Sequence, residues 1–165
     1  MDSATIPALY SLKNPAFVSL VKFGTLIVAK MVLMSIVTTI YRVIYNSYVS
    51  EEDYALVYPE DKEKVKKKAL VAQNANVERV RRAHQNDLEN IVPFVLLAMF
   101  YIATNPDLAT AALVFKSFAA IRFLHTIFYI GKIRQPSRSL AFFGGLLINM
   151  FMAQQILFSL CDLET

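Results

Sequence analysis

Four long apolar runs constrain the fold of this chain more than any other feature of its sequence. A helix needs about 20 mostly apolar residues to cross the hydrocarbon core of a bilayer, which is roughly 30 Å thick. Hydrophobic residues make up 56% of the 165 residues, more than the roughly 45–50% of soluble domains. We therefore predict an all-α fold, an integral membrane four-helix bundle. The runs cover residues 23–41, interrupted only by Lys30; 88–103; 108–130, which holds Lys116, Arg122 and His125; and 140–160, which carries no charge.

The predicted helices extend these runs within a single membrane domain that covers residues 1–165. They span about 17–46, 77–103, 108–131 and 137–160. The second helix starts in a polar stretch near Val77, because its apolar run alone is too short to cross a bilayer. Residues 47–76 are rich in charge and are predicted to form an exposed loop. Tight turns at 105–107 and 131–136 join the other helices, so both termini lie on one side of the membrane.

Basic residues gather beside the first and third connections. The 17 Lys and Arg against 13 Asp and Glu give a net charge of +4. Such a charge could indicate nucleic acid only if it lay on an exposed soluble face, and most of these residues flank apolar runs instead, so we predict no nucleic-acid partner. The positive-inside rule places these two connections in the cytoplasm. The residues are Lys62, Lys64, Lys66, Lys67, Lys68, Arg79, Arg81, Arg82, Lys132, Arg134 and Arg138.

Polar residues at the start of the second helix fall on two faces, at about 100° per residue. One stripe holds Glu78, Arg82, Asn86 and Glu89, with Gln85 at its edge. This stripe is either a surface ladder of ion pairs spaced by four residues or part of a ligand site at the cytoplasmic mouth. The opposite face is assigned to structural pairing with neighbouring loops or helices. It holds Arg81, His84, Asp87 and Asn90.

Arg122 on the third helix requires an anionic partner, because a buried guanidinium does not deprotonate. The partner is a protein carboxylate such as Glu89 or a bound anionic ligand, and both alternatives stay open. His125, Thr126 and Tyr129 share the face of Arg122. A lone histidine on such a face is more often structural than a ligand, and we predict no metal site.

Cations lie at the cytoplasmic ends of the other helices as well. Arg42 ends the first helix, with Asp53 eleven residues later, and Arg138 begins the fourth helix beside Ser139. The dipole and free amides of a helix N-terminus favour an anion, which here is a ligand group or a lipid phosphate. Four helices that each offer a cation or amide suit a zwitterionic, net-negative, water-soluble ligand. A second, apolar substrate could enter from the bilayer.

Two sequence blocks carry a resemblance to a known family. The segment VERVRRAHQNDLENIVPF, followed by IRFLHTIFYIGKIRQPSRSLAFF, resembles the membrane-associated proteins in eicosanoid and glutathione metabolism (MAPEG), over about residues 17–160. The resemblance implies a homotrimer with glutathione sites at subunit interfaces near the cytoplasmic side. The glutathione contacts that it implies are Arg42, Arg82, Asn86, Glu89, Arg122, His125, Tyr129 and Arg138.

The resemblance also implies the chemistry: a glutathione transferase that conjugates hydrophobic electrophiles and reduces lipid hydroperoxides, with glutathione as co-substrate and no metal. It makes Arg138 the group that stabilises the thiolate, helped by Ser139, with Asp53 orienting Arg138 or a water molecule. The expected location is the endoplasmic reticulum membrane, in contact with membrane lipids, with the outer mitochondrial membrane as a further location.

Two other activities remain open within the family. A glutathione-dependent isomerase of a prostaglandin endoperoxide is compatible with Ser139, although Phe142 and Gln85 replace a tyrosine and an arginine of that branch. A non-catalytic, lipid-presenting membrane protein is the second alternative. The retained arginines argue against it, because the family's adaptor lacks that set.

Overall fold

The computed structural model describes residues 6–71 and 74–164, and the regular structure within these residues is helical. Four helices there are long and apolar enough to cross a membrane. The predicted all-α membrane fold is therefore confirmed. The helices are α1 (Ile6–Leu9), α2 (Pro15–Ile44), α3 (Glu51–Val57), α4 (Lys62–Ala69), α5 (Ala75–Ala103), α6 (Leu108–Ile130) and α7 (Ser137–Glu164).

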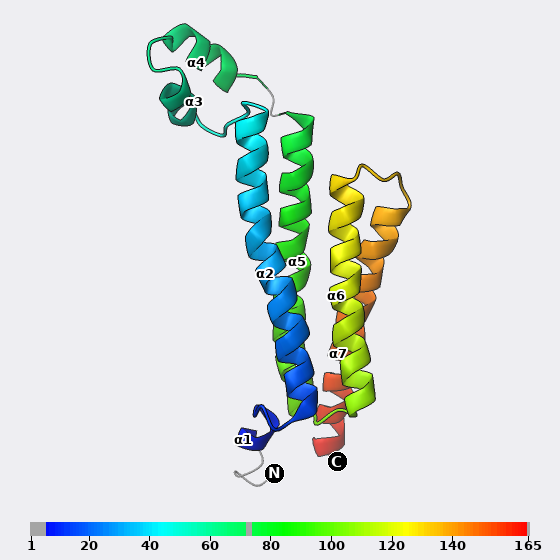
Figure 1. Ribbon diagram of the computed structural model, residues 1–165. Helices are drawn as coiled ribbons and strands as arrows, with labels where there is room; N and C mark the ends of the chain where they lie inside the picture. The colour runs from blue at the N-terminus through cyan, green and yellow to red at the C-terminus, as the bar shows by residue number, and fades with distance from the viewer. Residues whose placement is uncertain (1–5, 72–73, 165) are drawn as a thin grey trace.

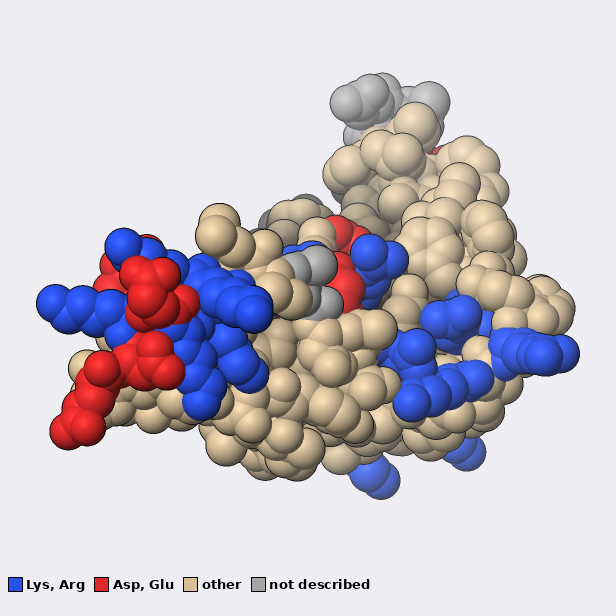
Figure 2. All heavy atoms as spheres, turned by 90° about the horizontal axis from the view of Figure 1, so that it is seen from above, with Lys and Arg blue, Asp and Glu red and all other residues tan. Residues whose placement is uncertain are grey.

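The four long helices run side by side, and both ends of the described chain lie at the same end of the bundle (Figure 1). Helix α2 packs against α5 and α6, and α7 packs against α6 and α5. Helices α3 and α4 and the α6–α7 connection lie at the opposite end. Seen from that end, Lys and Arg side chains gather over α3 and α4 and again over the α6–α7 end (Figure 2).

Side-chain caps set where the long helices begin. The Asn14 side chain caps α2 by accepting a hydrogen bond from the Ala16 amide. The Asn74 side chain caps α5 by accepting from the Asn76 amide. Asp107 caps α6 by accepting from the amide of Thr110 at 2.9 Å. Such caps satisfy amides that have no partner within the helix. The bonds from the amide and hydroxyl of Thr110 also lower the pKa of Asp107 below its ordinary value of 3.8.

The connection predicted as an exposed loop over residues 47–76 contains two helices, α3 and α4. Ser50 and Asp53 form a reciprocal capping box at the start of α3, and Asp61 caps α4 by accepting from the Lys64 amide at 2.9 Å. The prediction was wrong about local structure because high charge indicates exposure to water, and an exposed segment with good caps still forms helices.

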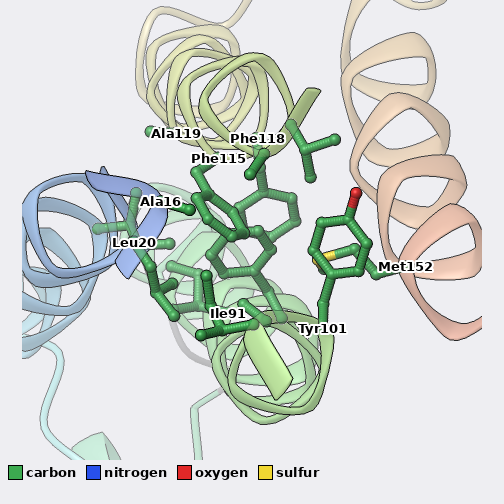
Figure 3. Packing of buried hydrophobic residues seen from close by; sticks show 14 residues of the cluster. Ala16, Leu20, Ile91, Tyr101, Phe115, Phe118, Ala119 and Met152 are labelled. Carbon is green, nitrogen blue, oxygen red and sulfur yellow. The ribbon is translucent and has the colours of Figure 1, made fainter. Parts of the chain in front are cut away.

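The apolar core packs between the long helices (Figure 3). Its residues come from the first halves of α2 and α6 and the second halves of α5 and α7, so it lies in the part of the bundle nearest the termini. Phe94 of α5 stacks on Phe118 of α6 with ring centroids 3.8 Å apart, and it meets Phe115 edge to face at 6.0 Å. All three side chains are fully buried. Met152 brings α7 into the same cluster. The outward sides of the long helices expose many aliphatic residues, as expected of surfaces that face lipid.

Candidate functional site

A polar pocket of about 140 Å³ lies where α5, the end of α6 and the start of α7 meet, and Asn86, His125, Tyr129, Gln135, Arg138, Ser139 and Phe142 line it. Most of these residues are among the predicted glutathione contacts or catalytic residues. They come from three helices and one connection, so only the packing of the bundle brings them together.

Arg138 is held against an aromatic side chain in this pocket. Its guanidinium carbon lies 5.0 Å from the centre of the Tyr129 ring, a cation–π contact, and Tyr129 in turn packs against His125 at 4.9 Å. The buried Nε of Arg138 has no hydrogen-bond partner among the described residues. A cation with an unpaired N–H, in the first turn of α7 where the helix dipole is positive, favours an anion.

Ser139 makes its hydrogen bond with a residue that the sequence reasoning missed. The Ser139 hydroxyl donates to Oε1 of Gln135 at 2.8 Å, and the Ser139 amide donates to the same oxygen at 3.3 Å. Gln135 therefore caps α7 and sets the direction of the Ser139 hydroxyl. Gln135 was predicted only as part of a turn, because glutamine is not among the residues that usually cap a helix.

Arg122 lies behind the pocket wall and is fully buried. Its Nη2 donates to Oδ1 of Asp87 at 2.6 Å and to Oδ1 of Asn86 at 2.9 Å. The protein carboxylate that Arg122 requires is therefore Asp87, and Glu89, which the sequence analysis named, is wrong. The two acids are two positions apart on α5, about 200° around the helix, so Asp87 is buried while Glu89 is exposed.

Lys30 completes this buried group and was also missed as a partner. Its Nζ donates to Oδ2 of Asp87 at 2.6 Å and to the backbone oxygen of Arg122 at 3.2 Å. Asp87 thus pairs with cations from α2 and α6 at once. The available signal was Lys30 itself, because a lone charge within an apolar membrane run is expected to have a buried partner.

The remaining predicted residues lie outside this pocket. Arg82 pairs with Glu78 at 2.8 Å, four residues apart as in the predicted ladder. Arg81, which was predicted to lie on the opposite face, pairs with the same carboxylate at 2.8 Å, and Glu89 accepts from Gln85 at 3.1 Å. These side chains belong to α5 and do not line the pocket.

Arg42 and Asp53 are likewise separate from the pocket. Arg42 lies in the last turn of α2, and its buried Nε has no partner among the described residues. Asp53 caps α3 through the amide of Ser50, and α3 lies beside the upper end of α2, away from the start of α7 (Figure 1). Within the described residues, no group of three or more His, Cys, Asp or Glu could hold a metal ion.

Comparisons with known proteins cover nearly the whole bundle. The chain is 40% identical to microsomal glutathione S-transferase 1 of Sus scrofa over 146 residues, 88% of this chain and 92% of that protein. The same protein of Homo sapiens is 39% identical over 144 residues, 87% of this chain and 90% of that protein. Prostaglandin E synthase of Equus caballus is 32% identical over 154 residues, 91% of this chain and 93% of that protein. A sequence model of the MAPEG family matches residues 20–158, from α2 to α7, and the chain therefore belongs to that family.

Proposed function

We propose that this protein is a membrane-bound glutathione S-transferase that conjugates glutathione to hydrophobic electrophiles and thereby detoxifies them. The observation that carries the proposal is the pocket at the start of α7, where Arg138 is fixed over Tyr129 with an unpaired Nε. Support also comes from the relatives named microsomal glutathione S-transferase 1, which match most of the chain. The apolar flanks of the helices suit substrates that arrive through the bilayer.

The polar residues fit the charges of glutathione, which carries two carboxylates, an ammonium and a thiol. Guanidinium groups bind carboxylates through paired, charge-assisted hydrogen bonds, which assigns Arg42 and Arg82 to the carboxylate ends. Arg122 is buried and paired with Asp87, so it would act on the ligand through its neighbours Asn86 and His125. Glu89 would bind the ammonium. Asn86 and His125 line the same pocket as Arg138 and add hydrogen bonds to the peptide.

Arg138 would favour the thiolate over the thiol, helped by the first turn of α7 and by Ser139. When bound, glutathione supplies the sulfur nucleophile, which forms a bond to an electrophilic carbon as the leaving group departs. The same site would reduce a lipid hydroperoxide to an alcohol and water, with two thiols oxidised to a disulfide. Asp53 would act on Arg138 or a water molecule only from a neighbouring protomer, because α3 lies away from α7 within one chain.

The proposed assembly is a homotrimer of single-domain protomers with the glutathione sites between subunits. One protomer offers a pocket of about 140 Å³, less than the roughly 300 Å³ at which small-molecule sites begin. Arg42, Arg82, Glu89 and Asp53 lie outside that pocket, so a second copy would be needed to complete the set. The proposed location is the endoplasmic reticulum membrane, and also the outer mitochondrial membrane, with the α3–α4 and α6–α7 ends in the cytoplasm.

A glutathione-dependent prostaglandin-endoperoxide isomerase is the second candidate. It is favoured by the 32% identity to prostaglandin E synthase and by Ser139 in the pocket. Phe142, which also lines the pocket, stands where that branch has a tyrosine and weighs against it. Turnover of an aryl halide compared with turnover of an endoperoxide, measured on the same preparation, separates the two activities.

The test is a glutathione titration of the purified, detergent-solubilised protein, followed by the ultraviolet absorbance of the thiolate. The unmodified protein should develop the thiolate band and conjugate a model aryl halide. Arg138→Ala should keep its assembly but lose the band, because the cation that favours the anion is gone. Arg134→Ala removes an exposed arginine from the same connection and should leave the band intact. An unchanged band in Arg138→Ala would remove Arg138 from the mechanism.

A further inference from the structure

Two side chains connect the buried group of charges with the pocket. Asn86 and His125 line the pocket, and both also contact Nη2 of Arg122, at 2.9 Å through Asn86 Oδ1 and at 3.4 Å through His125 Nδ1. Arg122 itself does not line the pocket. Whatever Arg122 does for a ligand therefore passes through these two neighbours.

The chemistry of a guanidinium decides how these neighbours are oriented. Arginine carries only donors and no acceptor, so the atoms that face it must accept. Asn86 must present its carbonyl oxygen to Arg122, which leaves its NH₂ group for the pocket. Nδ1 of His125 lies 3.4 Å from the same Nη2, whose two N–H groups have Asp87 and Asn86 as acceptors. An unprotonated Nδ1 is favoured beside this cation, and it places the ring proton on Nε2.

Arg122 is fixed in this role by contacts with two other helices. Asp87, fully buried, accepts a hydrogen bond from Nη2 at 2.6 Å, and Lys30, only 8% exposed, donates to the second oxygen of Asp87 at 2.6 Å. Lys30 also donates to the backbone oxygen of Arg122 at 3.2 Å. The carboxylate cannot turn away from Arg122 without leaving Lys30, so the direction of the guanidinium is held by α2 and α5 together.

We propose that Lys30, Asp87 and Arg122 are positioning residues that fix the His125 tautomer and the Asn86 amide, so that the pocket presents N–H donors from both to an anion. The anion is a carboxylate or thiolate of the ligand. Its identification as glutathione rests on the proposed function, whereas the orientation of the donors does not. A purely structural role, in which the three charges only tie the helices together, would leave the His125 tautomer unconstrained.

The test is the ¹⁵N spectrum of the imidazole rings in the full chain, labelled at histidine and solubilised in detergent. The chain has two histidines, so His84→Gln leaves His125 as the single signal. The expected result is one neutral tautomer with the proton on Nε2. A proton on Nδ1, or a doubly protonated ring, overturns the proposal.

Two variants of the charged group give the decisive comparison. Arg122→Lys keeps a cation for Asp87 but lacks the fork that reaches Asn86 and His125, so His125 should become a mixture of tautomers. Lys30→Met should also give a mixture of His125 tautomers, because Asp87 then loses one of the two cations that hold it. Lys30→Arg keeps that cation and should give the single tautomer. Lys116→Met removes an exposed lysine from α6 and should change nothing. An unchanged His125 spectrum in both Arg122→Lys and Lys30→Met overturns the proposal. The test does not depend on a variant of Asp87, whose loss leaves two buried cations unpaired.

Glutathione binding measured by calorimetry supplies the functional half of the experiment. Arg122→Lys should weaken binding by roughly tenfold or more, the usual effect of losing hydrogen bonds to a charged group, and Lys30→Arg should bind better than Lys30→Met. If the unmodified protein does not bind glutathione while His125 shows the expected tautomer, the proposed function fails and the positioning inference stands. Normal binding in a variant with mixed tautomers would overturn the link between the tautomer and the ligand.

Discussion

The two halves of the bundle are held together by different forces. Near the termini, Phe94, Phe115 and Phe118 pack with Met152 in a cluster without a charge. Toward the other end, Lys30, Asp87 and Arg122 meet through bonds of 2.6 Å. The apolar half gains its stability from many weak contacts, whereas the polar half depends on a few directional bonds in a low dielectric.

This contrast matters because the surrounding solvent is lipid. Lipid tails are as apolar as the core, so burying a phenylalanine between helices gains packing but little hydrophobic free energy. A charge left unpaired in the same interior costs far more, since neither water nor another group compensates it. The polar half should therefore be the less tolerant of substitution, although it contains fewer residues.

The largest effect is expected from Asp87→Ala. The substitution leaves two buried cations without their carboxylate and should lower the free energy of unfolding by about 3–5 kcal/mol, the usual cost of breaking a buried ion pair from one side. Unfolding in mild detergent by added dodecyl sulfate, followed by far-ultraviolet circular dichroism, measures it. Glu60→Ala, at an exposed position, is the control and should have almost no effect. If Asp87→Ala lowered the free energy of unfolding no more than replacing a core phenylalanine by alanine does, the polar half would not be the less tolerant one.

A smaller effect is expected from Phe118→Ala in the apolar half. The ring is fully buried and stacked on Phe94, but in lipid the cost should be close to the cavity contribution alone. At about 24 cal/mol per Å³ of cavity, a void the size of the ring costs about 2 kcal/mol. The same unfolding assay tests this value. A cost equal to that of Asp87→Ala would show that apolar packing contributes as much as the ion pairs.

The smallest effect is expected from Asp107→Ala, at the exposed start of α6. Asp107 accepts from the amide and hydroxyl of Thr110, and its pKa lies below the ordinary 3.8. A depressed carboxyl pKa contributes stability that is complete above the unfolded pKa and is lost as the pH falls through the folded pKa. The variant should melt a few degrees lower at neutral pH, and the gap should close in acid. A pH-independent gap would mean that the charge has no part in the cap.

The candidate site could be predicted from the sequence in part. Helical facing grouped Arg122, His125 and Tyr129, and the structure places them in the C-terminal half of α6. Facing also put Asp87 on a structural face, and it left the partner of Arg122 open between a carboxylate such as Glu89 and a bound anion. Helical periodicity tells which residues share a face, but it does not tell which neighbouring helix covers that face. Only the packing of α2 and α6 on α5 identified Asp87 as the carboxylate that Arg122 needs.

What the sequence determined by itself is the part that depends on local chemistry and length: four apolar spans, charged connections gathered at one end, and two motif blocks specific enough to indicate the family. The tertiary structure decided which charges meet. Lys30 and Arg122 are 92 residues apart in the chain and share one carboxylate, and no pattern along the sequence specifies that pairing. Its physical reason is that a buried charge is stable only beside its partner, and helix packing alone determines which partner comes within 3 Å.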